Sequence, residues 1–510
     1  MAILGNIIKA AIELKEKFTP NPDAVSAQEQ ILNDLLKTAE HTEFGQHYQF
    51  NKIMAATTPP KMFAEMVPVH DYQKIYDEWW HRVVAGEENI TWPGRPQYLA
   101  LSSGTTGSTS KRIPVTDEML AAIRNTGIQQ VTSLANFDLP PEFFEKEIMM
   151  LGSSTDLQEH NGFLEGEISG ISASNIPAWF KGFYKPGDEI ARIADWDERV
   201  QKIAEKAKEW DIGALSGIPS WIELMLKKVI KYHNLNNIHD IWPNLSVYTP
   251  GGVAFEPYRK SFEKLLAHPL IYLDTYLASE GFLAFQNRLD TTAMTLVVDN
   301  GIYFEFVPFK ETNMTEEGNV HPEADVLTLA EVEEDRDYVL LISTVAGAWR
   351  YMIGDTVKFT DLARREIIIT GRTKHFLNVV GSQLSVHKMN AAIQRLEEQF
   401  QVGIQEFTVA AVRREEDQEY IHKWYLGSDD AMDAEKVAQA LDDILQEMNK
   451  NYRVARSKAL KDVKVSVVPA DVFYQWSEAS KKKGGQVKTS RVMNEEEFAE
   501  WEAFAQQAKV

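Results

Sequence analysis

Cysteine is absent from the 510 residues of this sequence. Disulfide scaffolds, cysteine-ligated zinc sites, iron–sulfur clusters and thiol nucleophiles are therefore excluded. The lack of disulfides also fits the cytoplasm, which is the location that we expect for the protein. No stretch approaches 18 uninterrupted apolar residues, so no membrane-spanning helix is expected.

Basic residues are few, with 53 Lys and Arg against 75 Asp and Glu and a formal net charge of −22. Such a surface repels phosphate backbones, so neither a nucleic acid nor an anionic membrane is expected as a partner. A bound nucleotide would have to be met by local features, such as backbone amides, a few placed cations and a metal ion.

The N-terminus lacks the basic segment and unbroken apolar core of a signal peptide. Its apolar residues Ile3, Ile7, Ile8, Ala11 and Leu14 follow a helical period instead, which predicts a packed amphipathic helix. The length exceeds the ~250–300 residues at which a single core stops growing, so at least two domains are expected. The 44% hydrophobic and 25% charged fractions are those of an ordinary globular protein.

The pattern of elements changes along the chain. Helical patterns fill residues 1–90, and short strands then alternate with helices up to about residue 274, which predicts an α/β sheet. Closely spaced strands over 295–370 indicate a smaller, more antiparallel or barrel-like part. A compact α+β unit follows, and we place a domain boundary near residue 373.

The most distinctive segment is Ser102–Lys111, with seven hydroxyl residues, two glycines and a lysine. Glycines allow the backbone to approach phosphate oxygens, and amides and hydroxyls donate to them, so the segment suits a phosphate loop as well as a flexible surface loop. The Walker pattern fails, because Thr109 stands where its second glycine would be. In a phosphate loop, the contacts would come from Ser102, Ser103, Gly104, Thr105, Thr106 and Lys111.

Three further segments contain candidate binding residues. In Tyr276–Gly281, Glu280 follows a buried strand and could cap a helix or bind Mg²⁺, which prefers one or two carboxylates plus substrate phosphates. In Trp349–Asp355, the carboxylate suits ribose hydroxyls, although Gly-Asp also forms hairpin turns. Gly251 and Gly252 follow a predicted strand, where they either let the backbone lie against a flat base or simply form a turn.

Two segments lie near the proposed boundary and the C-terminus. Gly371–Lys374 stands where the pattern of elements changes. Gln486–Arg491 contains Lys488, whose simplest interpretation is an exposed lysine, because Lys481–Lys483 precede it.

Five segments in chain order resemble the GH3 acyl-acid amido synthetases of the adenylate-forming superfamily: Ser102–Lys111, Tyr276–Glu280, Trp349–Asp355, Gly371–Lys374 and Gln486–Arg491. By this resemblance we identify the chain as a bacterial member. SSGTTGSTSKRIP is similar to the family's SSGTSGG-x-x-K, followed by a hydrophobic residue and Pro. Tyr276–Glu280 matches a Tyr, two small or hydroxyl residues and Ser-Glu, although Ala278 lacks the family hydroxyl. Trp349–Asp355 is similar to YRYRVGD, with Met352 replacing an arginine, and Gln486–Arg491 is similar to QYKTPR.

The resemblance implies a role for each matched residue. Glu280 would bind the metal, Tyr276 would pack on the adenine, and Ser279 would lie near the α-phosphate. Asp355 would hold the ribose hydroxyls, with Arg372 also near the ribose. Lys488 would bridge the carboxylate and the α-phosphate as a catalytic cation.

The implied architecture is luciferase-like: an α/β fold with a large N-terminal domain of sheet and β-barrel-like parts, residues 1–372, and a small mobile α+β C-terminal domain, 373–510. The implied reaction uses ATP and Mg²⁺ to form an acyl-adenylate from a small carboxylic acid, and then transfers the acyl group to an amino acid. Two alternatives stay open: an AMP-forming acyl-CoA synthetase, and a nucleotide-binding homologue without catalysis. The acid pocket is expected between 116–130, 153–175 and 212–226.

Overall fold

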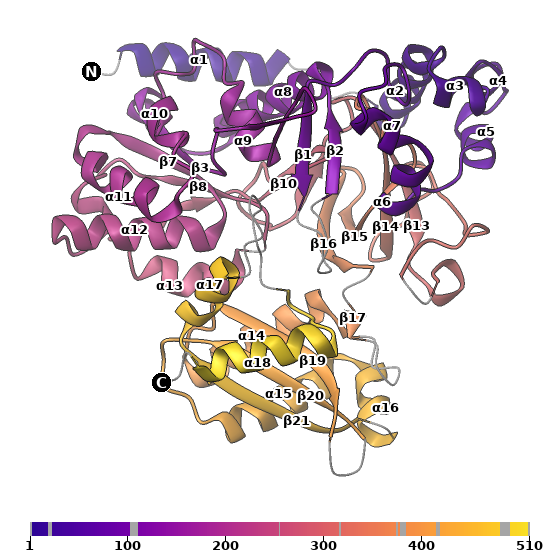
Figure 1. Cartoon of the computed structure of the whole chain (residues 1–510). Helices are drawn as coiled ribbons and strands as arrows, with labels where there is room; N and C mark the ends of the chain where they lie inside the picture. The colour runs from indigo at the N-terminus through magenta and orange to yellow at the C-terminus, as the bar shows by residue number, and fades with distance from the viewer. Residues whose placement is uncertain are drawn as a thin grey trace. The chain divides into compact units, whose positions relative to one another are not determined.

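The computed structural model describes residues 3–18, 23–102, 111–253, 255–315, 318–373, 376–377, 384–414, 419–458, 460–479 and 490–507 (Figure 1). These residues form two units. The first comprises the described residues up to 253 together with 264–368, and the second comprises Phe255–Glu263 and the residues from Ile369 onward. The first unit is large and mixed α/β and the second is smaller, so the predicted fold class is confirmed. The domain boundary near residue 373 and the mobility of the C-terminal domain stay predictions.

The N-terminal part of the first unit is helical, as its apolar period predicts. Helix α1 spans Ile3–Phe18, and α2 spans Ala24–Ala39, where the Asp23 side chain caps the first turn by accepting from the Ser26 amide at 3.0 Å. The shorter helices are α3 (Glu43–His47), α4 (Phe50–Met54), α5 (Pro59–Met66), α6 (Tyr72–Ile75), a π-helical turn (Tyr76–Trp80) and α7 (His81–Val84). In the part of the chain that the structure describes, no helix is both long and apolar enough to cross a bilayer.

A parallel five-stranded sheet occupies the middle of the chain, in the order β6-β3-β7-β8-β9. Its strands are β3 (Glu147–Leu151), β6 (Tyr184–Lys185), β7 (Ile212–Gly217), β8 (Val247–Pro250) and β9 (Ile271–Tyr272). The connecting helices include α10 (Asp188–Ala191), α11 (Trp196–Lys206) and α12 (Pro219–His233), of which α12 contacts β7. This alternation of strands and helices is the α/β pattern read from the sequence.

A four-stranded sheet carries the start of the expected phosphate loop, in the order β2-β1-β5-β4. Its strands are β1 (Tyr98–Ser102), β2 (Lys111–Val115), β4 (Gln158–His160) and β5 (Phe163–Gly166). Helix α8 (Asp117–Ser133) follows β2, and the hydroxyl of Thr116 caps it by accepting from the Met119 amide at 3.2 Å. Helix α9 spans Ile168–Ser174.

A seven-stranded sheet has the order β10-β11-β12-β16-β15-β14-β13 and belongs to the first unit except for the end of β16, from Ile369. Its strands are β10 (Thr275–Ala278), β11 (Gly281–Phe285), β12 (Met294–Leu296), β13 (Ile302–Pro308), β14 (Asp337–Thr344), β15 (Tyr351–Asp361) and β16 (Glu366–Arg372). The sheet curls, because a strand next to one edge reaches the strand at the other edge: a side chain on Gly281 of β11 would lie 2.7 Å from Ile302 of β13. This curvature agrees with the predicted barrel-like part.

The second unit contains a three-stranded sheet in the order β19-β20-β21, formed by Glu406–Arg413, Tyr420–Gly427 and Leu460–Val468 (Figure 1). Its helices are α14 (Val386–Phe400), α15 (Ala434–Met448), α16 (Lys450–Lys458), α17 (Ala470–Ala479) and α18 (Glu495–Gln507), with a small hairpin of β17 (Phe376–Leu377) and β18 (Leu384–Ser385). Helix α13 (Glu256–Glu263) also belongs to this unit, although it lies mid-chain. Tyr258 of α13 donates a hydrogen bond to Glu406, which also pairs with Arg491 at 2.6 Å.

Candidate functional site

The tight turn between β10 and β11 holds the predicted metal ligand. Ser279 and Glu280 form this two-residue turn, and Ala278 pairs with Gly281 across it. Gly281 has φ +151°, so the turn suits a glycine at that position. Glu280 is buried, with 8% of the residue exposed, so its side chain does not project into solvent.

Two residues of β15 hold the side chains of this hairpin. The Tyr276 hydroxyl donates to the Asp355 carboxylate at 2.6 Å, and both residues are buried. Tyr351, four residues before Asp355, hydrogen-bonds to Glu280. Burial raises the pKa of Tyr351 well above its ordinary value, and the charge of Glu280 raises it further, so this hydroxyl keeps its proton and donates to the carboxylate. The structure therefore brings Tyr276, Glu280 and Asp355 together around one pair of hydrogen bonds.

A hollow of about 200 Å³ adjoins Glu280. Ten residues line it, and they come from α8, the β10–β11 turn and the ends of β13 and β14: Met119, Ala122, Ile123, Glu280, Gly281, Phe282, Asn300, Ile302, Thr344 and Val345. Seven of the ten are apolar or glycine, so the hollow offers an apolar wall beside one carboxylate. Of the three segments expected to line the acid pocket, only 116–130 contributes here.

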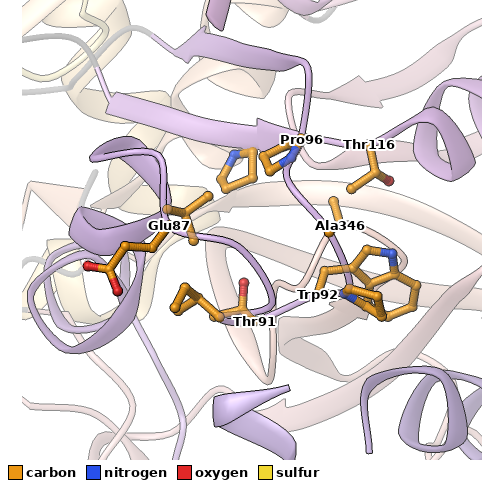
Figure 2. Close-up of a pocket in the computed structure, with 11 residues that line it drawn as sticks. Glu87, Thr91, Trp92, Pro96, Thr116 and Ala346 are labelled. Atoms are coloured by element: carbon orange, nitrogen blue, oxygen red, sulfur yellow. The ribbon is translucent and has the colours of Figure 1, made fainter. Parts of the chain in front are cut away.

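A second hollow of about 250 Å³ lies near the start of α8 and is drawn in Figure 2. Trp92, Pro96 and Ala346 are among the residues that line it, together with Thr116. The Thr116 hydroxyl donates to the Val345 carbonyl at 2.8 Å. Val345 and Ala346, the two residues after β14, line different hollows: Val345 lines the one beside Glu280, and Ala346 lines the second.

The predicted glycines after β8 have packing reasons of their own. A side chain on Gly251 would lie 2.6 Å from the hydroxyl of Thr275, which itself donates to the Pro250 carbonyl at 2.8 Å. Gly252 has φ +81°, a left-handed conformation that favours glycine. These contacts hold the end of β8 beside the start of β10, next to Tyr276.

The phosphate-loop prediction is only partly described. Ser102 and Lys111 are paired at the ends of β1 and β2, so the two ends of the predicted loop lie side by side. The Lys111 ammonium lies 5.2 Å from the ring centre of Tyr72. Ser103, Gly104, Thr105 and Thr106 lie outside the described residues, as does Lys488. Arg372 ends β16 and belongs to the second unit.

Sequence reasoning missed Tyr351 as a site residue, although it lies inside the motif that contains Asp355. An aromatic in a motif with a carboxylate was the available signal, but its partner Glu280 is too distant in sequence to be read from spacing. Met352, where plant members have an arginine, is buried in an apolar cluster with Val339 and Leu341.

Comparison with known proteins decides the family. Sequence models of the GH3 family N-terminal, central and C-terminal domains match residues 11–204, 295–366 and 387–497, in chain order and over most of the chain. The chain belongs to the GH3 family. The bacterial origin stays a prediction, because the relatives described next come from plants.

Two plant relatives resemble this GH3 protein over long stretches. A jasmonoyl–L-amino acid synthetase of Oryza sativa subsp. japonica is 24% identical over 402 residues, which are 66% of this chain and 68% of that protein. An indole-3-acetic acid-amido synthetase of Arabidopsis thaliana is 21% identical over 560 residues, covering 94% and 90% of the two chains.

Solved structures share the fold of this GH3 protein. A GH3.15 acyl acid amido synthetase superimposes with a TM-score of 0.78 at 17% identity, covering 98% of this chain and 96% of that one. A 2-hydroxyisobutyryl-CoA ligase has a TM-score of 0.59 at 13% identity, covering 96% and 93%. The predicted family, the fold class and the assignment to the ligases are therefore confirmed, because the named relatives and neighbours are synthetases and ligases.

Proposed function

We propose that this GH3 protein activates a small carboxylic acid with ATP and transfers the acyl group to the amine of an amino acid. In the first step a carboxylate oxygen attacks the α-phosphorus, pyrophosphate leaves, and an acyl-adenylate forms. In the second step the amine attacks the acyl carbon, AMP leaves with the electrons of the broken bond, and the amine loses a proton. The named relatives, which are amino acid synthetases, support this sequence of reactions.

The observation that carries the proposal is the cluster of Glu280, Tyr351, Asp355 and Tyr276 beside the 200 Å³ hollow. A carboxylate with two oxygens can accept from both ribose hydroxyls, which is the role that we assign to Asp355. The Tyr276 hydroxyl already bonds one Asp355 oxygen at 2.6 Å and so fixes the orientation of that carboxylate. Asp355 and the ring of Tyr276 would then hold the nucleoside.

The donor set around Glu280 fits Mg²⁺. Among the described residues, no three His, Asp or Glu side chains form a ready-made metal cage. A single oriented carboxylate is what Mg²⁺ uses when substrate phosphates provide further ligands. Glu280 would hold the ion, and the bound ion would offset negative charge on the phosphates. The Tyr351 hydroxyl holds that carboxylate in place.

The acid would occupy the hollow beside Glu280. The carboxylate of the acid must reach the α-phosphate, and the metal ligand Glu280 must also lie near the phosphates. The acid is therefore expected next to Glu280. Met119, Ile123 and Val345 offer an apolar wall to the carbon skeleton.

The remaining roles rest on the family resemblance. Ser102, Lys111 and the loop between them would hold the phosphates, with Ser279 near the α-phosphate and Arg372 near the ribose. Lys488 would supply a cation to the adenylation step. Rotation of a C-terminal domain about Thr373–Lys374 would open the path for the amino acid. A cytoplasmic location stays part of the same prediction.

The direct test measures pyrophosphate release with a panel of carboxylic acids, and then AMP release with amino acids or CoA added. We expect acid-dependent pyrophosphate release and AMP release that requires an amino acid. AMP release that requires CoA would instead support an acyl-CoA synthetase. Nucleotide binding without pyrophosphate release from any acid would support the non-catalytic alternative.

Site variants connect the reaction to the residues. Glu280→Gln should lower pyrophosphate release by on the order of 10²-fold, because a metal site is worth several kcal/mol. Glu323→Gln, which changes an exposed carboxylate of the same unit, is the matched control. Lys488→Ala should cost roughly 10²–10³ in adenylation while ATP binding persists. Gly104→Val should abolish ATP binding in a folded protein, and retained affinity would contradict the loop assignment.

A further inference from the structure

Asn300 is one of only three polar residues among those that line the hollow beside Glu280. It lies in the turn before β13 and is 6% exposed. The family resemblance assigns no role to this residue. Its side chain brings an amide to a wall that is otherwise mostly apolar.

The orientation of this amide is determined by its surroundings. Its Nδ2 donates to the carbonyl oxygen of Phe282 at 2.5 Å. The flipped orientation would place Oδ1 against that carbonyl, and two acceptors repel each other at this distance. The oxygen is therefore the free end of the amide. It is buried and has no hydrogen-bond partner among the described residues.

A buried acceptor without a partner is costly, and a ligand that supplies a donor recovers that cost. A carboxylate has no hydrogen to donate, and neither does a hydrocarbon chain. The donor must come from a hydroxyl or amino substituent on the carbon skeleton of the acid. Because Glu280 and Asn300 line the same hollow, the substituent lies only a few bonds from the carboxyl group.

We propose that the acid used by this protein carries a hydroxyl or amino substituent, which donates a hydrogen bond to Oδ1 of Asn300. This inference rests on the proposed function, since it takes the hollow as the acid site. Asn300 is then a specificity-determining residue, which rejects acids that leave its oxygen unpaired. Sites built around a buried polar group discriminate strongly against analogues that lack the matching group.

The first test uses the unmodified protein and sets of three acids with one skeleton and a hydroxyl, amino or methyl group at the same position. We expect kcat/KM for pyrophosphate release to be roughly ten- to a hundredfold higher for the acid with a hydroxyl or an amino group than for the acid with a methyl group. Comparison of the hydroxyl and amino analogues identifies which group donates to Asn300. Equal or higher activity with the methyl analogue in every set would overturn the proposal, and would mean that a bound water satisfies Asn300.

The second test changes the acceptor. Asn300→Leu should abolish or reverse the preference while the methyl analogue is still activated. Asn300→Ala is a smaller change for the case in which the leucine variant does not fold. The control is Asn313→Leu, because Asn313 is also buried and donates to a carbonyl, that of Pro308 at 3.0 Å, but does not line the hollow.

The control variant should keep the wild-type ratio between the acids, because a ratio does not depend on the folded fraction. An unchanged preference in both Asn300 variants would refute the role of this residue. If the wild-type protein releases pyrophosphate but shows no donor preference, this inference alone fails. If it releases none with any acid, the proposed function fails and the inference fails with it.

Discussion

Glu397 provides a sharp test of the physical reasoning in the second unit. It lies on α14, is 3% exposed, and accepts a hydrogen bond from the Ile404 amide at 2.7 Å. Burial raises its pKa from 4.5 to about 7, although the Ile404 amide and the charge of Lys260 oppose that change. A carboxyl group with this pKa is half protonated near neutral pH.

The size and sign of the effect follow from linkage. In the unfolded chain Glu397 titrates near 4.5, and in the native state near 7, so the native state holds the proton more tightly. The stabilisation from this proton is complete below pH 4.5 and is lost as the pH rises through 7. At 1.36 kcal/mol for each pH unit between the two pKa values, the loss is roughly 3 kcal/mol, of which about 2–3 kcal/mol falls between pH 5 and pH 8.

The perturbation is Glu397→Gln, which keeps a carbonyl oxygen for the Ile404 amide but cannot ionise. The free energy of unfolding is measured in urea at pH 5 and pH 8 for the wild type, for this variant and for Glu398→Gln, which changes the exposed neighbour. We expect the variant to gain about 2–3 kcal/mol relative to the wild type between pH 5 and pH 8. A difference that is the same at both pH values would refute the raised pKa, and so would a similar gain in Glu398→Gln.

Three further predictions concern the first unit. Glu305→Gln should lower the free energy of unfolding by about 3–5 kcal/mol, because the buried Arg350 guanidinium, 2.9 Å from Glu305, loses its counter-charge; urea unfolding with no loss would contradict this. Gly347→Ala should destabilise by roughly 1–3 kcal/mol in thermal unfolding, since φ is +76° and a Cβ would lie 2.5 Å from the Thr91 hydroxyl; an unchanged Tm would count against the strain. Asp355→Asn should weaken ATP binding by about ten- to a hundredfold in calorimetry, through loss of charge-assisted bonds to ribose, and unaltered affinity would exclude the ribose role.

Periodicity predicted the regular elements well. The strand Glu147–Leu151 and the helix Val386–Phe400 lie where the sequence has the matching period, because each buries a face with the period of its element. Strand β15 forms although it contains Gly354 and Asp355, which are residues typical of turns. Its pairing with β14 and β16 in the curled sheet overrides that local preference.

The site was predictable only as a set of motifs. Residue type and the family resemblance selected Tyr276, Glu280 and Asp355, but not the hydrogen bonds that hold them across the curled sheet. Tyr351 and Asn300 were missed for the same reason. Tyr351 bonds to Glu280 and Asn300 bonds to Phe282, and neither contact can be read from sequence spacing. Neither the composition nor the periodicity of the sequence shows that a buried acceptor lacks a hydrogen-bond partner.

Helix α13 has a consequence for any attempt to divide this protein. The second unit is not one continuous stretch of chain, since Phe255–Glu263 is built into it. A fragment that starts after residue 372 would lack Tyr258, the donor to Glu406, and would also lack the buried ring of Phe262. Such a fragment should be expressed with α13 joined to it by a linker. By the same division, the chain passes between the two units at both ends of α13 as well as after Ile368.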